Sequence, residues 1–308
     1  MNSNVKSVLT DLDLSSSQVQ NVLDLAIAMK QDPEKYSQVL QGKSIATLFE
    51  KPSLRTRVSL DVGINKMGGH SVYLDQQNGS MGKREDVADF GANLSCWCDA
   101  IVARVMSHDT LLQLKSAARV PVINSLCDLY HPCQALADYM SLQELFGPLQ
   151  GLNLAYIGDG NNVCHSLMLT GAKLGVNVFV VTPKGHSVDD AIATKAAQLA
   201  QESNADLTIT SDLDSLKRVH AIYADTWVSM GDNTKPEDIL TAFAPYRVTR
   251  PLMNKLEAQY FMHCQPAHRD EEVTAEVLDS PQSIILRQAE NRMWAQNALL
   301  HTLINGQA

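Results

Sequence analysis

Residues 50–57 read Glu-Lys-Pro-Ser-Leu-Arg-Thr-Arg and directly follow the apolar run Ile45-Ala46-Thr47-Leu48-Phe49. The stretch brings two hydroxyls and two guanidiniums together where a strand-like run ends and a helix begins. Backbone N–H groups at a helix N-terminus point toward an anion, and arginine forks match phosphate oxygens bidentately. The pattern therefore predicts a phosphate cradle at the end of a strand. The alternative is a capping Ser53 followed by a solvated basic turn.

Apolar runs of strand length recur in both halves of the chain and alternate with stretches of helical periodicity. Parallel strands are buried on both faces, so they read as near-continuous apolar runs. The alternation predicts an α/β fold of two domains, each with a parallel β-sheet flanked by helices. The predicted strands are residues 44–49, 71–74, 100–105, 120–123, 152–157, 176–181, 206–210, 220–224, 260–262 and 283–286.

The second series of strands starts after Gly147-Pro148, which sets the predicted domain boundary. Residues 1–146 then form the first domain and residues 147–289 the second. A helix over residues 132–145 joins the two domains. A C-terminal helix within residues 290–308 is expected to pack back on the first domain.

The composition limits the classes of function. The chain has 308 residues, of which 45% are hydrophobic and 19% charged, and its formal net charge is −9. This charge argues against nucleic acid or a membrane surface as partner. No apolar run reaches the roughly 20 residues that span a bilayer, and the N-terminus has no signal-peptide pattern. The six cysteines are scattered, which suits a cytoplasmic protein, and Cys96-Trp97-Cys98 lacks a second ligand pair at zinc spacing.

Polar side chains follow the strands of the first half. Ligands of open α/β sheets lie beyond the carboxyl ends of the strands. Arg104 follows Ala100–Ala103 in the third predicted strand. His131 and Gln134 are three residues apart at the start of a helix, so they share one face. With residues 53–56, these groups could recognise an anion and a carbonyl. The alternatives are that Arg104 is a surface charge, that His131 is a hydrogen-bonded histidine at a helix N-terminus and that Gln134 is solvated.

The second half carries a different set of groups after its strands. Gly158-Asp159-Gly160-Asn161-Asn162 is half of a dinucleotide fingerprint without its third glycine, and its amides suit a carboxylate instead. Asp225, with Ser229 four residues later, could hold an ammonium. Cys264 is either a nucleophile, which needs a base nearby, or a positioning group.

The chain has no Walker lysine motif, so ATP is not expected. The two halves together would suit an acyl-phosphate-like donor and an amino-acid-like acceptor.

These motifs, in this order, resemble the aspartate/ornithine carbamoyltransferase family over almost the whole chain, and within it the members that use ornithine. Ser53-Leu54-Arg55-Thr56-Arg57 resembles the family's S-T-R-T-R, and His131-Pro132-Cys133-Gln134 its H-P-x-Q. Asp225-x-x-x-Ser229-Met230-Gly231 resembles D-x-x-x-S-M-G, and residues 263–268 resemble H-C-L-P-A-H. Glu290-Asn291-Arg292 matches the E-N-R of the final helix.

The resemblance implies a reaction between carbamoyl phosphate and L-ornithine that gives L-citrulline and phosphate, without metal or cofactor. It implies that the carbamoyl oxygen is polarised by Arg104, His131 and Thr56. The implied carbamoyl-phosphate contacts are Ser53, Leu54 (its amide), Arg55, Thr56, Ser80, Arg84, Arg104, His131, Gln134, Cys264, Gln265 and Arg292. The implied ornithine contacts are Asn162, Asp225, Ser229 and Met230, and the implied catalytic groups are Arg104, His131, Asp225 and Cys264.

The family also implies an assembly. Its loop that corresponds to residues 79–86 reaches a neighbouring subunit's site, so Ser80 and Arg84 imply a homotrimer, or a higher assembly of trimers, with shared sites. Two positions depart from the family pattern: Leu54 replaces a threonine and Gln265 replaces a leucine. Two alternatives therefore stay open, namely a carbamoyltransferase for putrescine or an N-acylornithine, and a catalytically silent anion- or amino-acid-binding protein on the same fold.

Overall fold

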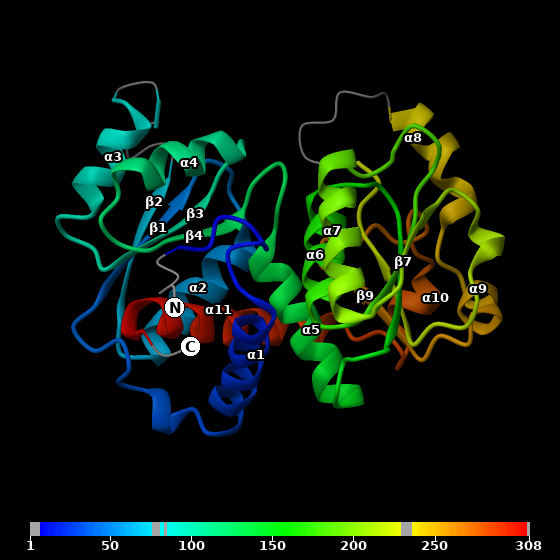
Figure 1. Ribbon diagram of the computed structural model, residues 1–308, viewed down its shortest axis with the longest axis horizontal. Coiled ribbons are helices and arrows are strands. Elements are labelled where there is room, and N and C mark those ends of the chain that lie inside the picture. Colours follow the sequence, from blue (N-terminus) through cyan, green and yellow to red (C-terminus); the bar gives the residue numbers. More distant parts are fainter. Residues whose placement is uncertain (1–6, 76–80, 83–84, 229–235, 307–308) are drawn as a thin grey trace. The chain divides into compact units, whose positions relative to one another are not determined.

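The computed structural model describes residues 7–75, 81–82, 85–228 and 236–306 (Figure 1). The chain forms two compact units. Unit 1 comprises Met1–Met140 and Glu290–Ala308, and unit 2 comprises Ser141–Ala289. Four residues of the predicted site, Ser80, Arg84, Ser229 and Met230, lie outside the described residues.

Unit 1 is built on a four-stranded parallel sheet with strand order β2-β1-β3-β4. In Figure 1, α3 and α4 lie along one face of this sheet, and α2 and α11 lie along the other. Apolar residues of the central strands, such as Ala46, Leu48 and Ile101, are buried in the core. The elements are α1 (Ser16–Gln31), η1 (Glu34–Tyr36), β1 (Ser44–Phe49), α2 (Leu54–Lys66), β2 (His70–Asp75), α3 (Val87–Leu94), β3 (Ala100–Arg104), α4 (His108–Ala117) and β4 (Val122–Leu126).

Unit 2 is built on a five-stranded parallel sheet with strand order β7-β6-β5-β8-β9. The strand order reverses direction between β5 and β8, which is where ligands gather in open α/β sheets. The elements are β5 (Asn153–Ile157), α6 (Asn162–Lys173), β6 (Asn177–Val181), α7 (Asp190–Ser203), β7 (Leu207–Thr210), η3 (Leu213–Ser215), β8 (Ala221–Ala224), α8 (Pro236–Phe243), η4 (Ala244–Tyr246), α9 (Arg250–Lys255), β9 (Tyr260–His263) and α10 (Ala275–Leu278).

Two helices belong to both units. Helix α5 (Pro132–Phe146) begins in unit 1 and ends in unit 2, whereas α11 (Ile285–Asn305) begins in unit 2 and ends in unit 1. In unit 1, α11 is tied to α2 by a hydrogen bond from Ser59 Oγ to Gln296 Oε1 (2.9 Å). It is tied to α1 by an ion pair between Lys30 Nζ and Glu290 Oε2 (3.0 Å).

The prediction of two parallel-sheet domains flanked by helices is confirmed. The strand predicted at residues 283–286 is wrong. Ser283 forms an isolated bridge with Phe261 of β9, and α11 then begins at Ile285. β9 is the last strand of its sheet, and the chain adds only this bridge to it before the helix starts. The final helix therefore begins five residues before the predicted Glu290.

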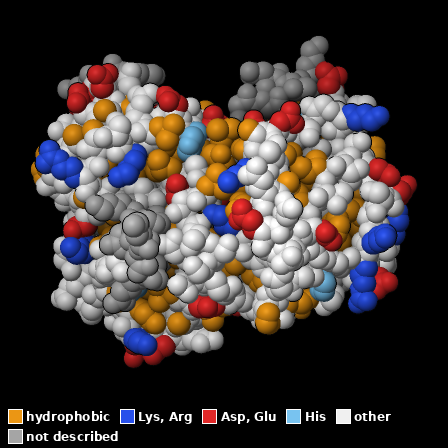
Figure 2. Space-filling view, in the orientation of Figure 1, with side chains coloured by type: hydrophobic (Ala, Val, Ile, Leu, Met, Phe, Trp, Pro, Cys, Tyr) orange, Lys and Arg blue, Asp and Glu red, His pale blue; other side chains and the backbone are white. Residues whose placement is uncertain are grey.

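Acidic and basic side chains are interspersed over the visible face of the molecule, with hydrophobic side chains between them (Figure 2). Among the helices that the structure describes, none combines the length and the apolar character needed to cross a membrane.

Candidate functional site

The loop between β1 and α2 forms the base of the site in unit 1. Ser53 caps α2 with an extended backbone (φ −154°, ψ 114°), and its Oγ accepts from the Thr56 N–H at 3.4 Å. The remaining N–H groups of the first turn, including those of Leu54 and Arg55, have no partner within the helix. They are available to an anion, which the helix N-terminus also favours electrostatically.

Thr56 is the centre of a buried hydrogen-bond cluster. Its side chain is 1% exposed, and Oγ1 accepts from Arg292 Nη2 at 3.0 Å and lies 3.5 Å from Arg104 Nη1. Arg292 also donates through Nη1 to Gln134 Oε1 at 2.6 Å. Gln134 in turn donates through Nε2 to Asp138 Oδ1 at 2.8 Å. α2, β3, α5 and α11 thus each contribute a side chain to one cluster.

His131 precedes the first residue of α5 and is buried beside this cluster. Burial, together with the charges of Arg292 and Arg104, holds the pKa of His131 well below its usual range. Its imidazole is therefore neutral near pH 7. A neutral imidazole beside two guanidiniums can polarise a carbonyl oxygen without adding a third buried positive charge.

The exposed arginines of α2 differ from one another. The Arg57 guanidinium lies over the Tyr73 ring, 3.7 Å from its centroid, and forms an ion pair with Asp61 at 3.6 Å. Arg55 is exposed at the first turn of the helix, next to the free amides. Burial and the charge of Arg104 lower the pKa of Lys51, so the positive field of Arg104 extends to this residue. The cluster as a whole suits a doubly charged anion.

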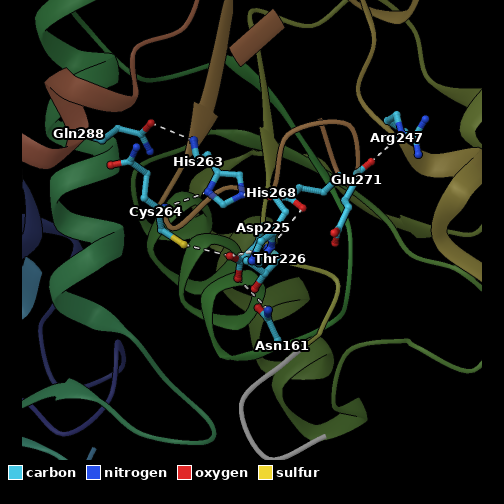
Figure 3. Close-up of polar contacts among 11 residues, drawn as sticks. Asn161, Asp225, Thr226, Arg247, His263, Cys264, His268, Glu271 and Gln288 are labelled. Atoms are coloured by element: carbon cyan, nitrogen blue, oxygen red, sulfur yellow. Dashed lines mark hydrogen bonds and ion pairs between the residues drawn. The ribbon is translucent and has the colours of Figure 1, made fainter. Parts of the chain in front are cut away.

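The site in unit 2 is centred on Asp225, which directly follows β8 (Figure 3). Its buried carboxylate accepts from Asn161 Nδ2 at 2.8 Å and from Cys264 Sγ at 3.0 Å. The Thr226 N–H donates to the same carboxylate at 2.8 Å. Asn161 is also the N-cap of α6, because its Oδ1 accepts from the amides of Val163 and Cys164. Three donors therefore fix the carboxylate in place.

The loop after β9 is fixed by a buried histidine. His263 Nδ1 accepts from the Gln265 N–H at 2.8 Å, so the proton of the neutral imidazole lies on Nε2. Nε2 lies 2.9 Å from Glu272 Oε1, and both side chains are fully buried. Gln288 Oε1 accepts from the His263 N–H at 3.0 Å. These bonds hold the backbone around Cys264, including Gln265 at a positive φ of 59°.

The structure brings many of the predicted site residues together within each unit. In unit 1, hydrogen bonds connect Ser53, Thr56, Arg104, Gln134 and Arg292, and the charges of Arg104 and Arg292 act on His131. The side chain of Leu54 is 76% exposed, at the first residue of α2. In unit 2, Asp225 contacts Cys264 directly, and Asn162 is the first residue of α6.

Sequence reasoning missed four residues of these clusters: Asp138, Asn161, His263 and Glu272. Asn161 lies in the quoted Gly158–Asn162 stretch, so the signal for it was present, but its neighbour Asn162 was chosen. His263 opens the quoted motif 263–268, but no role was assigned to it, and Asp138 and Glu272 lie outside every quoted motif.

Two groups of side chains in the described part of the chain could hold a metal ion. In one group, ligand atoms of Asp225, His263 and Cys264 lie within 4.8 Å of one another. In the other, those of His268, Glu271 and Glu272 do so.

The fold and the two clusters define a two-unit α/β protein with a buried cluster of arginines, a neutral histidine and polar side chains on one unit and a buried carboxylate on the other. The chain belongs to the aspartate/ornithine carbamoyltransferase family. The carbamoyl-P binding domain of that family matches residues 6–144, and its Asp/Orn binding domain matches residues 150–303.

Relatives with ornithine in their names match nearly the full length of the chain. Ornithine carbamoyltransferase of Vibrio sp. (strain 2693) is 52% identical over 300 residues, which cover 97% of this chain and 100% of the relative. That of Shewanella oneidensis is 53% identical over 301 residues, which cover 98% of this chain and 100% of the relative. The solved structure of ornithine carbamoyltransferase from Pyrococcus furiosus matches with a TM-score of 0.93 and 42% identity, covering 99% of this chain and 98% of that one.

Proposed function

We propose that this protein transfers the carbamoyl group of carbamoyl phosphate to the δ-amine of L-ornithine, giving L-citrulline and phosphate. The observation that carries the proposal is the buried Arg292–Thr56–Gln134 cluster beside neutral His131, in the unit that matches the carbamoyl-P binding domain. The Asp225–Cys264 pair, in the unit that matches the Asp/Orn binding domain, supports ornithine as the acceptor.

The proposed donor site uses the groups of unit 1. The α2 amides, Ser53, Thr56 and Arg55 bind the phosphate, with Arg292 as a further contact. Arg104 and His131 donate to the carbamoyl oxygen, on which negative charge develops as the carbonyl carbon becomes tetrahedral. Gln134 accepts from the carbamoyl NH2. With the phosphate and the carbamoyl oxygen bound in this way, the carbonyl carbon is the electrophile and the phosphate is a stabilised leaving group.

The proposed acceptor site uses the groups of unit 2. Asp225 and Ser229 bind the α-ammonium, while Asn162 and the Met230 amide bind the carboxylate. Cys264, beside Asp225, contacts the δ-amine and forms no covalent bond. The neutral δ-amine attacks the carbamoyl carbon, a C–N bond forms, and the C–O bond to phosphate breaks. The proton that the nitrogen loses can pass to the departing phosphate.

The experiment that tests this function compares acceptors. Purified protein, with carbamoyl phosphate in excess, is assayed for product with ornithine, putrescine and N-acetylornithine. Putrescine has no carboxylate for Asn162, and N-acetylornithine has no α-ammonium for Asp225, so ornithine should be preferred. Arg104→Ala should lose activity, whereas Arg218→Ala, at an exposed ion pair with Glu257, should retain it. A folded protein that forms no citrulline would refute the proposal, and equal use of putrescine would reassign the acceptor.

We also propose that the protein assembles as a homotrimer, or a higher assembly of trimers, whose subunits share sites. The exposed apolar face of α2 supports this. Leu54, Val58 and Val62 are spaced by four residues and are 76%, 49% and 41% exposed. Side chains at this spacing form one stripe, and large exposed apolar stripes mark protein–protein interfaces. The stripe begins at the phosphate cradle, where a second copy of the chain could add Ser80 and Arg84.

Complementation tests the shared site. Arg55→Ala and the double variant Ser80→Ala/Arg84→Ala should each be nearly inactive. After dissociation and reassociation together, they should regain activity, because some interfaces then pair an intact Arg55 with an intact loop. Mixed assemblies that form but stay inactive would contradict the shared site, and so would a fully active dilute monomer.

We propose a cytoplasmic location. No disulfide joins the six cysteines, all of which lie in the described residues, and five of the six are at least partly buried. Thiols that stay reduced are typical of a reducing compartment.

A further inference from the structure

A tight turn after β9 gathers His268, Glu271 and Glu272. The Asp270 N–H donates to the Val273 carbonyl at 2.7 Å, and the Glu271 N–H donates to the His268 carbonyl at 3.1 Å. The chain therefore folds back on itself. One ligand atom from each of the three side chains lies within 4.8 Å of the others. Figure 3 shows His268 and Glu271 on this turn, on the far side of His263 from Cys264.

Glu272 has a carboxylate oxygen that lacks a hydrogen-bond donor. The residue is 1% exposed, and its Oε1 accepts from His263 Nε2 at 2.9 Å and from the His268 N–H at 2.7 Å. Its Oε2 is buried and accepts no hydrogen bond from the described residues. A buried carboxylate oxygen without a donor is destabilising, so Oε2 favours a positive partner.

The nearest partner of that oxygen is His268 Nδ1, at a distance of 3.7 Å. This is too long for a hydrogen bond. It is close to the separation of two ligands on one ion, since bonds of about 2.0–2.2 Å at a tetrahedral angle place their ends about 3.4 Å apart. Arg247 Nε donates to the backbone carbonyl of Glu271 at 2.7 Å, and Arg269 pairs with Asp279 at 2.7 Å. These printed contacts of the two arginines are thus not to the carboxylates of the cluster.

We propose that His268 Nδ1, Glu272 Oε2 and a carboxylate oxygen of Glu271 bind a divalent transition-metal cation of the Zn²⁺ type. One imidazole and two carboxylates suit Zn²⁺ or Mn²⁺, whereas Mg²⁺ and Ca²⁺ prefer all-oxygen sets. His268 and Glu271 are exposed, so the cation can enter from solvent and keep water in its remaining positions. The site shares no ligand with the residues assigned to carbamoyl phosphate or ornithine, and it does not rest on the proposed function.

Metal titration of the full-length protein tests the site. Protein treated with a chelator and dialysed is titrated with Zn²⁺ by calorimetry and with Co²⁺ by visible absorption. The variants are His268→Ala, Glu271→Ala and Glu272→Gln. The last keeps an oxygen that can accept from His263 Nε2 but replaces Oε2 with an NH2 group. Glu202→Ala removes an exposed glutamate of α7 as a charge-matched control, and circular dichroism checks the fold of every variant.

The expected result is saturable binding of one Zn²⁺ per chain at micromolar concentration. Each ligand variant should weaken binding by about tenfold or more. Glu202→Ala should not weaken it, and the Co²⁺ spectrum should lack a thiolate charge-transfer band. Cys264→Ser separates this site from the Asp225–His263–Cys264 group and should leave binding unchanged. Weak or absent binding to the natural chain, unchanged binding to folded His268→Ala and Glu271→Ala, or loss of binding in Cys264→Ser would overturn the proposal.

Discussion

Replacing Thr56 by valine tests whether one buried hydroxyl organises the cluster of unit 1. Valine keeps the shape of threonine but lacks the hydroxyl oxygen. In the natural protein this oxygen accepts a hydrogen bond from Arg292 Nη2 at 3.0 Å. A hydrogen bond to a charged group contributes about 1.5–3 kcal/mol. The contact to Arg104 Nη1, at 3.5 Å, is too long to add much. We therefore expect Thr56→Val to lower the free energy of unfolding by about 1.5–3 kcal/mol. For a unit of this size, that lowers the melting temperature by about 3–12 °C.

Thr56→Ser is the matched control, since it keeps the hydroxyl and loses a methyl group. A buried methylene contributes about 0.8 kcal/mol, so serine should be the milder change. In calorimetric melting curves, the natural protein should be the most stable, Thr56→Ser intermediate and Thr56→Val the least stable. In citrulline formation, kcat/KM for carbamoyl phosphate should fall by about 10- to 150-fold in Thr56→Val, the same free energy expressed as a rate. A valine variant that is at least as stable and active as the serine variant would refute a role for the hydroxyl.

Two further predictions concern charge. Asp225→Asn should strongly impair the use of ornithine, because the ammonium of ornithine loses its counter-charge. Binding of carbamoyl phosphate, measured by calorimetry, should stay nearly unchanged. Equal loss of ornithine use and of carbamoyl phosphate binding would mean that Asp225 supports the fold. His131 is held neutral by burial and by Arg292 and Arg104, so its folded pKa lies below its unfolded value of about 6.5. Below that pH the unfolded chain binds a proton that the folded chain does not, so stability should fall as pH drops through 6.5 and below. Urea unfolding of His131→Gln should show a flatter dependence over the same pH range, and an unchanged slope would contradict the assignment.

The sequence was sufficient where a local pattern marks an element. The run 44–49 is mostly apolar and ends before a capping serine, so both β1 and the start of α2 could be predicted. Residues 283–286 are equally apolar, yet they lead into α11. An edge strand such as β9 offers hydrogen bonds on one side only, and the sequence does not reveal whether the next segment takes them.

The site could be predicted in part, for a similar reason. Ser53, Arg55 and Thr56 are neighbours in the chain, so their spacing alone indicates a cradle. The bond between Arg292 and Thr56 joins residues 236 positions apart. The family resemblance implied that both contact carbamoyl phosphate, but it did not predict this bond. Glu272 lies in the charged turn Arg269-Asp270-Glu271-Glu272, which is typical of a solvated loop. Its burial against His263 follows from tertiary packing and leaves no local signature.

The pKa shifts of neighbouring groups show that the two clusters carry opposite electrostatic fields. In unit 1, burial and positive neighbours lower the pKa of both Lys51 and His131. In unit 2, burial and the charge of Asp225 raise the pKa of Tyr156, and burial with the charges of Asp159 and Asp225 raises that of Cys164. Burial alone would raise the pKa of acids and lower the pKa of bases in either unit. The charged neighbours of these groups, however, are positive in unit 1 and negative in unit 2.

This division explains how a chain of net charge −9 can bind a phosphate. Coulomb interactions weaken with distance and with screening by salt, with a Debye length of about 8 Å at physiological ionic strength. The scattered surface carboxylates therefore act weakly on the cradle, whereas Arg104 and Arg292 act at hydrogen-bond distance within it. The proposed donor is an anion and the proposed acceptor carries an ammonium, so the positive cluster of unit 1 favours the first and the carboxylates of unit 2 favour the second. In the proposed function, the charges of each unit would thus help to select between the two substrates.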